Sequence, residues 1–99
     1  MEKMVKIVYN ACFGGFGLSE EAIKMYEAHS GKIIRNYYDI ERDDPILVDV
    51  VEFLGSEKAS RFSANLQIAL VPKGAKYRID EYDGSENVMT IDEYDWKIA

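Results

Sequence analysis

The sequence predicts an α+β fold: one domain over residues 1–99, with a mixed β-sheet of about five strands and two main helices packed on one face. Three observations support this prediction. Apolar, strand-like segments recur along the chain, two segments are bracketed by helix-capping residues, and Asp83-Gly84 separates two alternating segments near the end. The expected order along the chain is β-α-β-α-β-β-β.

The first strand is expected over residues 4–12, which are apolar-rich and lead into glycines. Ser19 should then cap the first helix, because two glutamates follow it in the first turn, where the helix dipole favours carboxylates. Gly31 is expected to end that helix in the left-handed conformation. Isoleucines and tyrosines between Lys32 and Ile40 predict a second strand.

The segment from Ile46 to Leu54 is rich in valine, so its composition alone does not separate helix from strand. The flanking residues favour a helix: Asp44 suits the N-cap, Pro45 the first helical position and Gly55 the residue after the end. The two polar residues of the segment lie three apart on one narrow stripe. We therefore expect a mostly buried helix.

The remaining elements are expected to be mainly strands. Residues 56–65 read as a polar helical turn or two, and apolar residues alternate in a third strand over residues 66–72. Lys76–Tyr82 and Glu86–Ile91 flank Asp83-Gly84, a strong hairpin signal.

Composition excludes several classes of function. The net charge is −6 and the 12 basic residues are scattered, which argues against binding to a nucleic-acid backbone. A single cysteine excludes an internal disulfide, and no apolar run approaches the ~20 residues that span a membrane. We therefore expect a cytoplasmic protein. Seven tyrosines, four phenylalanines and one tryptophan are difficult to bury in a small monomer, which favours a homo-oligomer.

The segment between the first strand and the first helix is the main candidate for function. Three glycines there are interleaved with Phe13 and Phe16. Glycine amides can hold a phosphate, contact another ligand or form a purely structural turn, and the spacing matches no dinucleotide or P-loop motif. The two rings could stack on a base, or serve as core or oligomer contacts.

A ligand at this loop would need further partners. Arg42 or Arg35 could pair its phosphates, and Asn10 could bind a polar edge of it. The candidate ligand-binding residues are Asn10, Phe13, Gly14, Gly15, Phe16, Gly17, Arg35 and Arg42.

We expect no catalytic residues, no metal site and no cofactor. The only histidine, His29, lies at the far end of the first helix from Cys12, so we interpret the cysteine as a small buried residue. Acidic residues around Arg42 could hold Mg²⁺, but they match no calcium loop and are better explained by helix capping and solvation.

Three stretches of the chain resemble a family of small proteins common in bacteriophage and prophage genomes. They are Lys6 to Ser19, Arg42 to Glu52 and Glu81 to Glu86. The resemblance extends to about residue 88. It implies a phage origin and a host-cytoplasm setting, without an assigned activity.

Two hypotheses about function follow. The first is a non-enzymatic phage protein that sequesters a small, anionic, nucleotide-like signal of host defence. The alternative is an inhibitor that binds a host defence protein through an acidic hairpin and tail. The acidic residues of that region are Asp80, Glu81, Asp83, Glu86, Asp92, Glu93 and Asp95.

Overall fold

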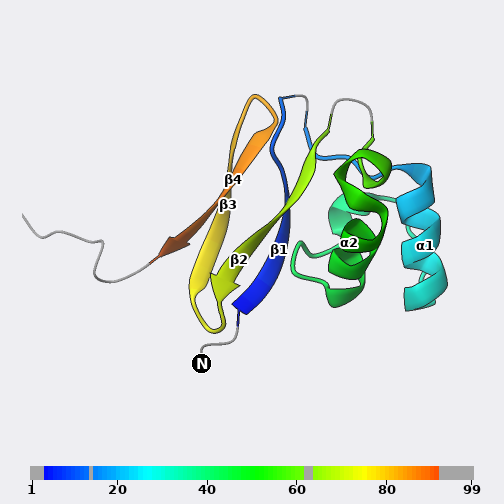
Figure 1. The fold of residues 1–99 in the computed structure, drawn as a ribbon, viewed down its shortest axis with the longest axis horizontal. Coiled ribbons are helices and arrows are strands. Elements are labelled where there is room, and N and C mark those ends of the chain that lie inside the picture. The colour runs from blue at the N-terminus through cyan, green and yellow to red at the C-terminus, as the bar shows by residue number, and fades with distance from the viewer. Residues whose placement is uncertain (1–3, 14, 62–63, 92–99) are drawn as a thin grey trace, which may run out of the picture.

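The computed structural model describes residues 4–13, 15–61 and 64–91 of the 99-residue chain. Figure 1 shows the arrangement of the helices and strands. In chain order, the elements are β1 (Met4–Asn10), α1 (Glu20–Ser30), a short 3₁₀ helix (Tyr37–Asp39), α2 (Pro45–Ala59), β2 (Leu66–Pro72), β3 (Lys76–Tyr82) and β4 (Ser85–Ile91). The fold is α+β, as predicted.

The strands form two antiparallel pairs, β1 with β2 and β3 with β4. The β3–β4 hairpin lies on one side of β1–β2 and the helices lie on the other (Figure 1). Helix α2 contacts both β1 and β2, while α1 packs against α2. The described residues thus hold four antiparallel strands instead of the mixed sheet of about five strands that the sequence predicted.

Both faces of β1–β2 are covered. Val8 pairs with Ile68, and these side chains belong to the core that β1 and β2 share with the helices. Because side chains alternate along a strand, Ile7 and Val71 point to the opposite face, and both are buried there on the side of the hairpin. The β1–β2 pair is therefore the middle layer of three.

The predicted caps of α1 are confirmed. The Ser19 hydroxyl accepts a hydrogen bond from the Ala22 amide at 3.1 Å. Gly31 is left-handed, with φ of 74°, and its amide donates to the Glu27 carbonyl at 2.9 Å.

The predicted start of α2 is also confirmed. The Asp44 carboxylate accepts from the Ile46 amide at 2.8 Å, and Pro45 occupies the first helical position. At Gly55 the backbone leaves the helical conformation, with φ of 82°, and one further turn extends to Ala59. The helix is less buried than expected, because Phe53 is 78 % exposed.

The predicted strand from Lys32 to Ile40 is wrong. This segment is irregular apart from the 3₁₀ helix, and side chains satisfy its amides locally. The Glu27 carboxylate accepts from the Ile34 amide at 2.7 Å, and the Asn36 side chain accepts from the Tyr38 amide at 3.0 Å. The first strand is also shorter than predicted, because β1 ends at Asn10.

The remaining sequence predictions concern the hairpin, the acidic tail and membrane-spanning segments. The hairpin at Asp83-Gly84 is confirmed, with Tyr82 opposite Ser85 at its turn. The acidic tail, residues 92–99, lies outside the described residues. Within the described residues, no helix has the length and apolar character needed to cross a membrane.

Tyr26→Phe should lower the free energy of unfolding by about 1 kcal/mol at neutral pH. The buried Tyr26 hydroxyl donates to the Asp44 carboxylate at 2.7 Å, linking α1 to the cap of α2. Burial and the Asp44 carboxylate raise the pKa of Tyr26 to about 12. Because the folded state holds this proton more tightly, its stabilising effect is lost as pH rises from about 10 towards 12. Urea unfolding at a series of pH values checks this. The variant has no hydroxyl at position 26, so its free energy of unfolding should not show this decrease at alkaline pH.

Candidate functional site

The side chain of Asn10 connects three segments of the chain. Asn10 is fully buried at the end of β1, and its Nδ2 donates to the carbonyls of Cys12 at 2.7 Å and Gly84 at 2.8 Å. Its Oδ1 accepts from the Asn65 amide at 2.8 Å. The loop after β1, the hairpin turn and the start of β2 are thus joined. Both donor hydrogens of the amide are used inside the protein, so the predicted role of Asn10 in ligand binding has little support in this geometry.

Arg42 forms an internal ion pair with Glu86. Its Nη1 and Nη2 lie 2.6 Å and 3.0 Å from the two carboxylate oxygens, and the side chains are only 16 % and 8 % exposed. Glu86 also accepts from the backbone N–H of Asn10 at 2.8 Å. The guanidinium lies 3.6 Å from the centroid of the Phe16 ring. The charge that a phosphate would need is therefore already paired inside the protein.

Phe16 is a core residue. It is buried, and its ring centroid lies 6.0 Å from that of Tyr37 and 6.1 Å from that of Tyr38. This cluster holds the 3₁₀ helix against the loop after β1, and the Tyr38 hydroxyl also donates to the Phe16 carbonyl at 3.0 Å. Of the sequence's alternatives for this ring, the geometry supports a packing role.

Two of the loop glycines have structural reasons to be glycine. Gly15 has φ of 98°, a conformation that side chains disfavour. Gly17 is buried, and a Cβ there would lie 3.2 Å from the Cβ of Arg61. Gly14 lies outside the described residues. A structural turn therefore explains the loop without a ligand.

The structure brings together only part of the predicted site. Asn10, Phe16 and Arg42 lie in one network that Glu86 completes. Arg35 is exposed on the segment before the 3₁₀ helix, and Cys12 is half-buried. Among the described residues, no three His, Cys, Asp or Glu side chains are grouped so that they could hold a metal ion.

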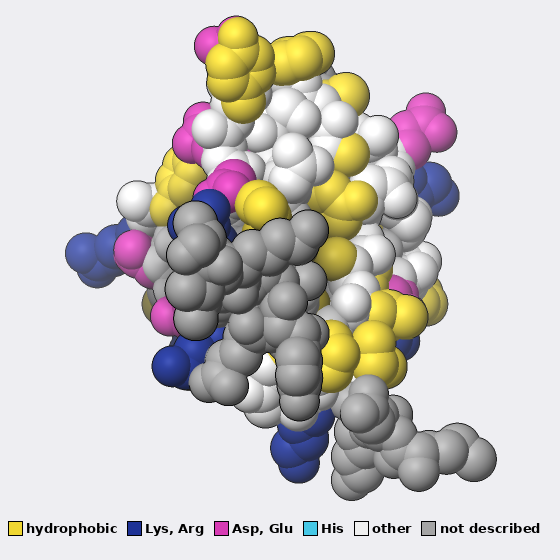
Figure 2. Space-filling view, turned by 90° about the vertical axis from the view of Figure 1, so that its left-hand side faces the viewer, with side chains coloured by type: hydrophobic (Ala, Val, Ile, Leu, Met, Phe, Trp, Pro, Cys, Tyr) yellow, Lys and Arg dark blue, Asp and Glu magenta, His cyan; other side chains and the backbone are white. Residues whose placement is uncertain are grey.

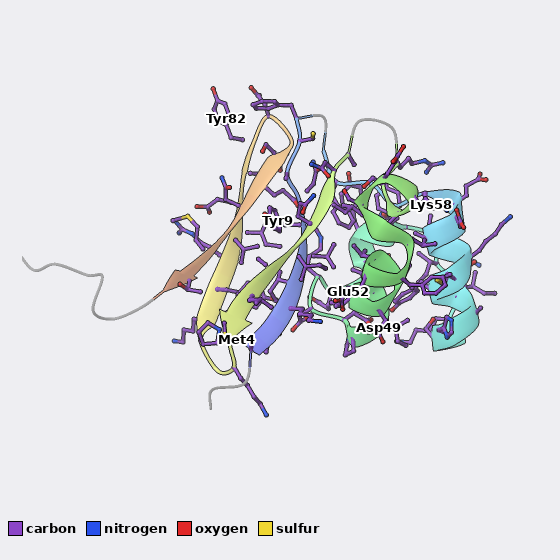
Figure 3. All side chains as sticks on the ribbon, viewed as in Figure 1. Met4, Tyr9, Asp49, Glu52, Lys58 and Tyr82 are labelled. Carbon is purple, nitrogen blue, oxygen red and sulfur yellow. The ribbon has the colours of Figure 1, made fainter. Side chains whose placement is uncertain are left out.

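An exposed aromatic and acidic surface lies at the hairpin turn. Figure 3 shows Tyr82 pointing outward at this end of the hairpin, and Figure 2 shows hydrophobic and acidic side chains together at the upper end of the molecule. We call these residues the tip surface: Phe13, Tyr38, Glu81, Tyr82 and Asp83. The three rings are 65 %, 58 % and 74 % exposed in that order, and both acidic residues are exposed.

Three separate segments supply the tip surface. Asn10 joins the loop that bears Phe13 to the hairpin turn that bears Tyr82. The third segment is the 3₁₀ helix, which bears Tyr38. Burial of its hydroxyl raises the pKa of Tyr38, and the nearby Tyr37 and the charge of Glu81 raise it further. The sequence pointed to the acidic residues here, but Tyr38 was assigned to a strand and Tyr82 was not singled out. The position of Tyr82 directly before the Asp83-Gly84 turn was the signal that could have indicated an exposed ring there.

No protein-family model matches this sequence, and neither a curated protein nor a solved structure matches the chain. The geometry of the described residues therefore carries the functional argument.

Proposed function

We propose that this chain is a non-enzymatic protein inhibitor that covers a basic, partly apolar face of a partner through its tip surface. The observation that carries the proposal is that exposed Phe13 and Tyr82, with the acids Glu81 and Asp83, lie on two segments that Asn10 joins. Tyr38 is exposed as well, and it lies near enough to Glu81 for that charge to raise its pKa. Exposed aromatic side chains are typical of the core of protein interfaces, and tyrosine provides large contact area at low entropic cost.

The tip surface is held in place by buried polar contacts. Asn10 bonds to the carbonyl of Gly84 in the turn, and the Arg42–Glu86 pair fixes the first residues of β4 against β1. A surface that is ordered before binding loses less conformational entropy when the partner docks. The two carboxylates and the net charge of −6 would speed association with a basic partner.

Sequestration of a nucleotide-like ligand has less support from this geometry. One of its two predicted cations, Arg42, is already neutralised by Glu86, and one of its two predicted stacking rings, Phe16, is buried. Arg35 and Phe13 are exposed. The resemblance to phage proteins favours a host defence protein as the partner and the host cytoplasm as the setting of the proposed inhibition.

Site-specific photo-crosslinking tests the proposal. A benzophenone amino acid in place of Tyr82 should give a defined protein adduct in lysate of a defence-competent bacterium. The same group in place of Ile33, which is 85 % exposed and outside the tip surface, should not. The double variant Glu81→Lys/Asp83→Lys should lower the adduct yield at least about tenfold, because like charges face a basic partner.

Glu57→Lys supplies the control, since Glu57 is an exposed acid on α2, outside the tip surface. Reversing the charge there should leave the yield of the crosslinked adduct unchanged. Native mass spectrometry of the protein from the same lysate separates the two hypotheses. A retained small molecule, with no adduct that depends on position 82, would contradict the inhibitor and favour ligand sequestration.

A further inference from the structure

A groove of about 470 Å³ lies between α1 and α2, on residues that the tip surface does not include. The two helices run antiparallel, with the end of α1 beside the start of α2 (Figure 1). Phe53 projects beside the groove with 78 % of its surface exposed. The residues that line it are Met25, His29, Ile46, Asp49, Val50 and Phe53.

The two sides of the groove carry complementary groups. Helix α1 supplies Met25 and His29, and α2 supplies Asp49 and Phe53, each pair one helical turn apart. In antiparallel helices, side chains lean towards opposite ends, because each leans towards the N-terminus of its own helix. His29 is thereby brought towards the level of Asp49, and Met25 towards that of Phe53.

We propose that a second copy of this chain docks on the groove, with the two-fold axis running along it. Such an axis places the α1 side of each copy on the α2 side of the other. Each His29 imidazole then donates to the partner's Asp49, and each Met25 sulfur packs on the partner's Phe53. The result is a four-helix bundle with a self-complementary interface.

Charge supports a second copy as the occupant. Asp49 lies on a mainly apolar groove and needs a hydrogen-bond donor when it is covered, which the symmetric arrangement supplies from His29. The next carboxylate on α2, Glu52, is bound to Lys6 of β1 at 2.9 Å. Docking of two copies would also cover Phe53, which the folded monomer leaves in water.

Complementary variants test the axis. By size-exclusion chromatography with light scattering, the wild-type chain should have twice its 11.3 kDa mass. His29→Glu should weaken self-association at least about tenfold, because it sets two carboxylates against each other. Asp49→Lys should do the same by covering an unpaired ammonium. An equimolar mixture of the two variants should recover the dimer, since each residue at position 29 then meets an opposite or hydrogen-bonding partner.

The controls separate this interface from misfolding and from other contacts. Both variants should keep the far-ultraviolet circular dichroism of the wild type, and Glu57→Lys, an exposed change on α2, should remain a dimer. A wild-type mass of 11.3 kDa at high concentration would overturn the proposal. So would a dimer that persists in both folded variants, or two folded monomeric variants that fail to associate when mixed.

Discussion

Arg42→Ala is expected to lower the free energy of unfolding by about 3–5 kcal/mol, the usual cost of breaking a buried ion pair by removing one partner. The change leaves Glu86, whose side chain is only 8 % exposed, without its bidentate donor. It also removes the guanidinium from the face of Phe16. A small domain has about 5–15 kcal/mol of stability in total, so the variant should be partly unfolded near 37 °C. Urea unfolding followed by circular dichroism measures the difference.

Two matched variants make this result specific. Arg78→Ala breaks the Arg78–Asp80 pair, whose side chains are 63 % and 43 % exposed, and should cost less than about 1 kcal/mol. Adding Glu86→Gln to Arg42→Ala should restore part of the lost stability, because no buried charge then remains unpaired. If Arg42→Ala proved as mild as Arg78→Ala, the ion pair would not be holding the hairpin, and a ligand-binding role for Arg42 would regain support.

The elements predicted correctly are those determined by local chemistry. Ser19 caps α1 through an amide three residues away, and Asp44 caps α2 through an amide two residues away. Gly31 has the left-handed conformation, and Asp83 and Gly84 have the positive φ values that a tight hairpin turn requires. Each of these contacts spans a few residues, so the sequence alone is enough to predict it.

The segment from Lys32 to Ile40 shows where local preference fails. Its isoleucines and tyrosines favour a strand, yet a strand forms only if an edge is available for pairing. Part of the free edge of β1 is occupied, because the Val8 amide donates to the Arg42 carbonyl at 2.8 Å. In the observed irregular segment Ile33 is 85 % exposed, whereas Ile34 packs on the core.

The site could not be predicted for a related reason. An arginine between elements and an asparagine at a strand end suit a ligand and an internal partner equally well. The partners that decide the matter are distant in sequence: Glu86 is 44 residues from Arg42, and Gly84 is 74 residues from Asn10. For the glycine loop, the sequence left a ligand and a structural turn open, and what lies close to Gly17 is Arg61 of the same chain.

Asn10→Leu should lower the free energy of unfolding by about 3 kcal/mol or more, since each buried polar group left without a partner costs about 1–3 kcal/mol. The substitution removes the donor for the carbonyls of Cys12 and Gly84 and the acceptor for the amide of Asn65. Three segments then lose their common contact. Asn87→Leu, a change of the same size at an exposed position on β4, should cost far less.

Asn10→Asp separates the hydrogen bonds from the packing, because it keeps the shape of the side chain. The new carboxylate would face the carbonyl oxygens of Cys12 and Gly84 and lie near Glu86, so the pKa of the introduced group should be raised in the folded state. A raised pKa means that the folded variant binds the proton more tightly than the unfolded chain. Its stability relative to the wild type should therefore improve as pH falls from about 7 towards about 4. Urea unfolding of both proteins across that range measures the difference, and a deficit independent of pH would show that the side-chain amide of Asn10 does not hold the loop to the hairpin.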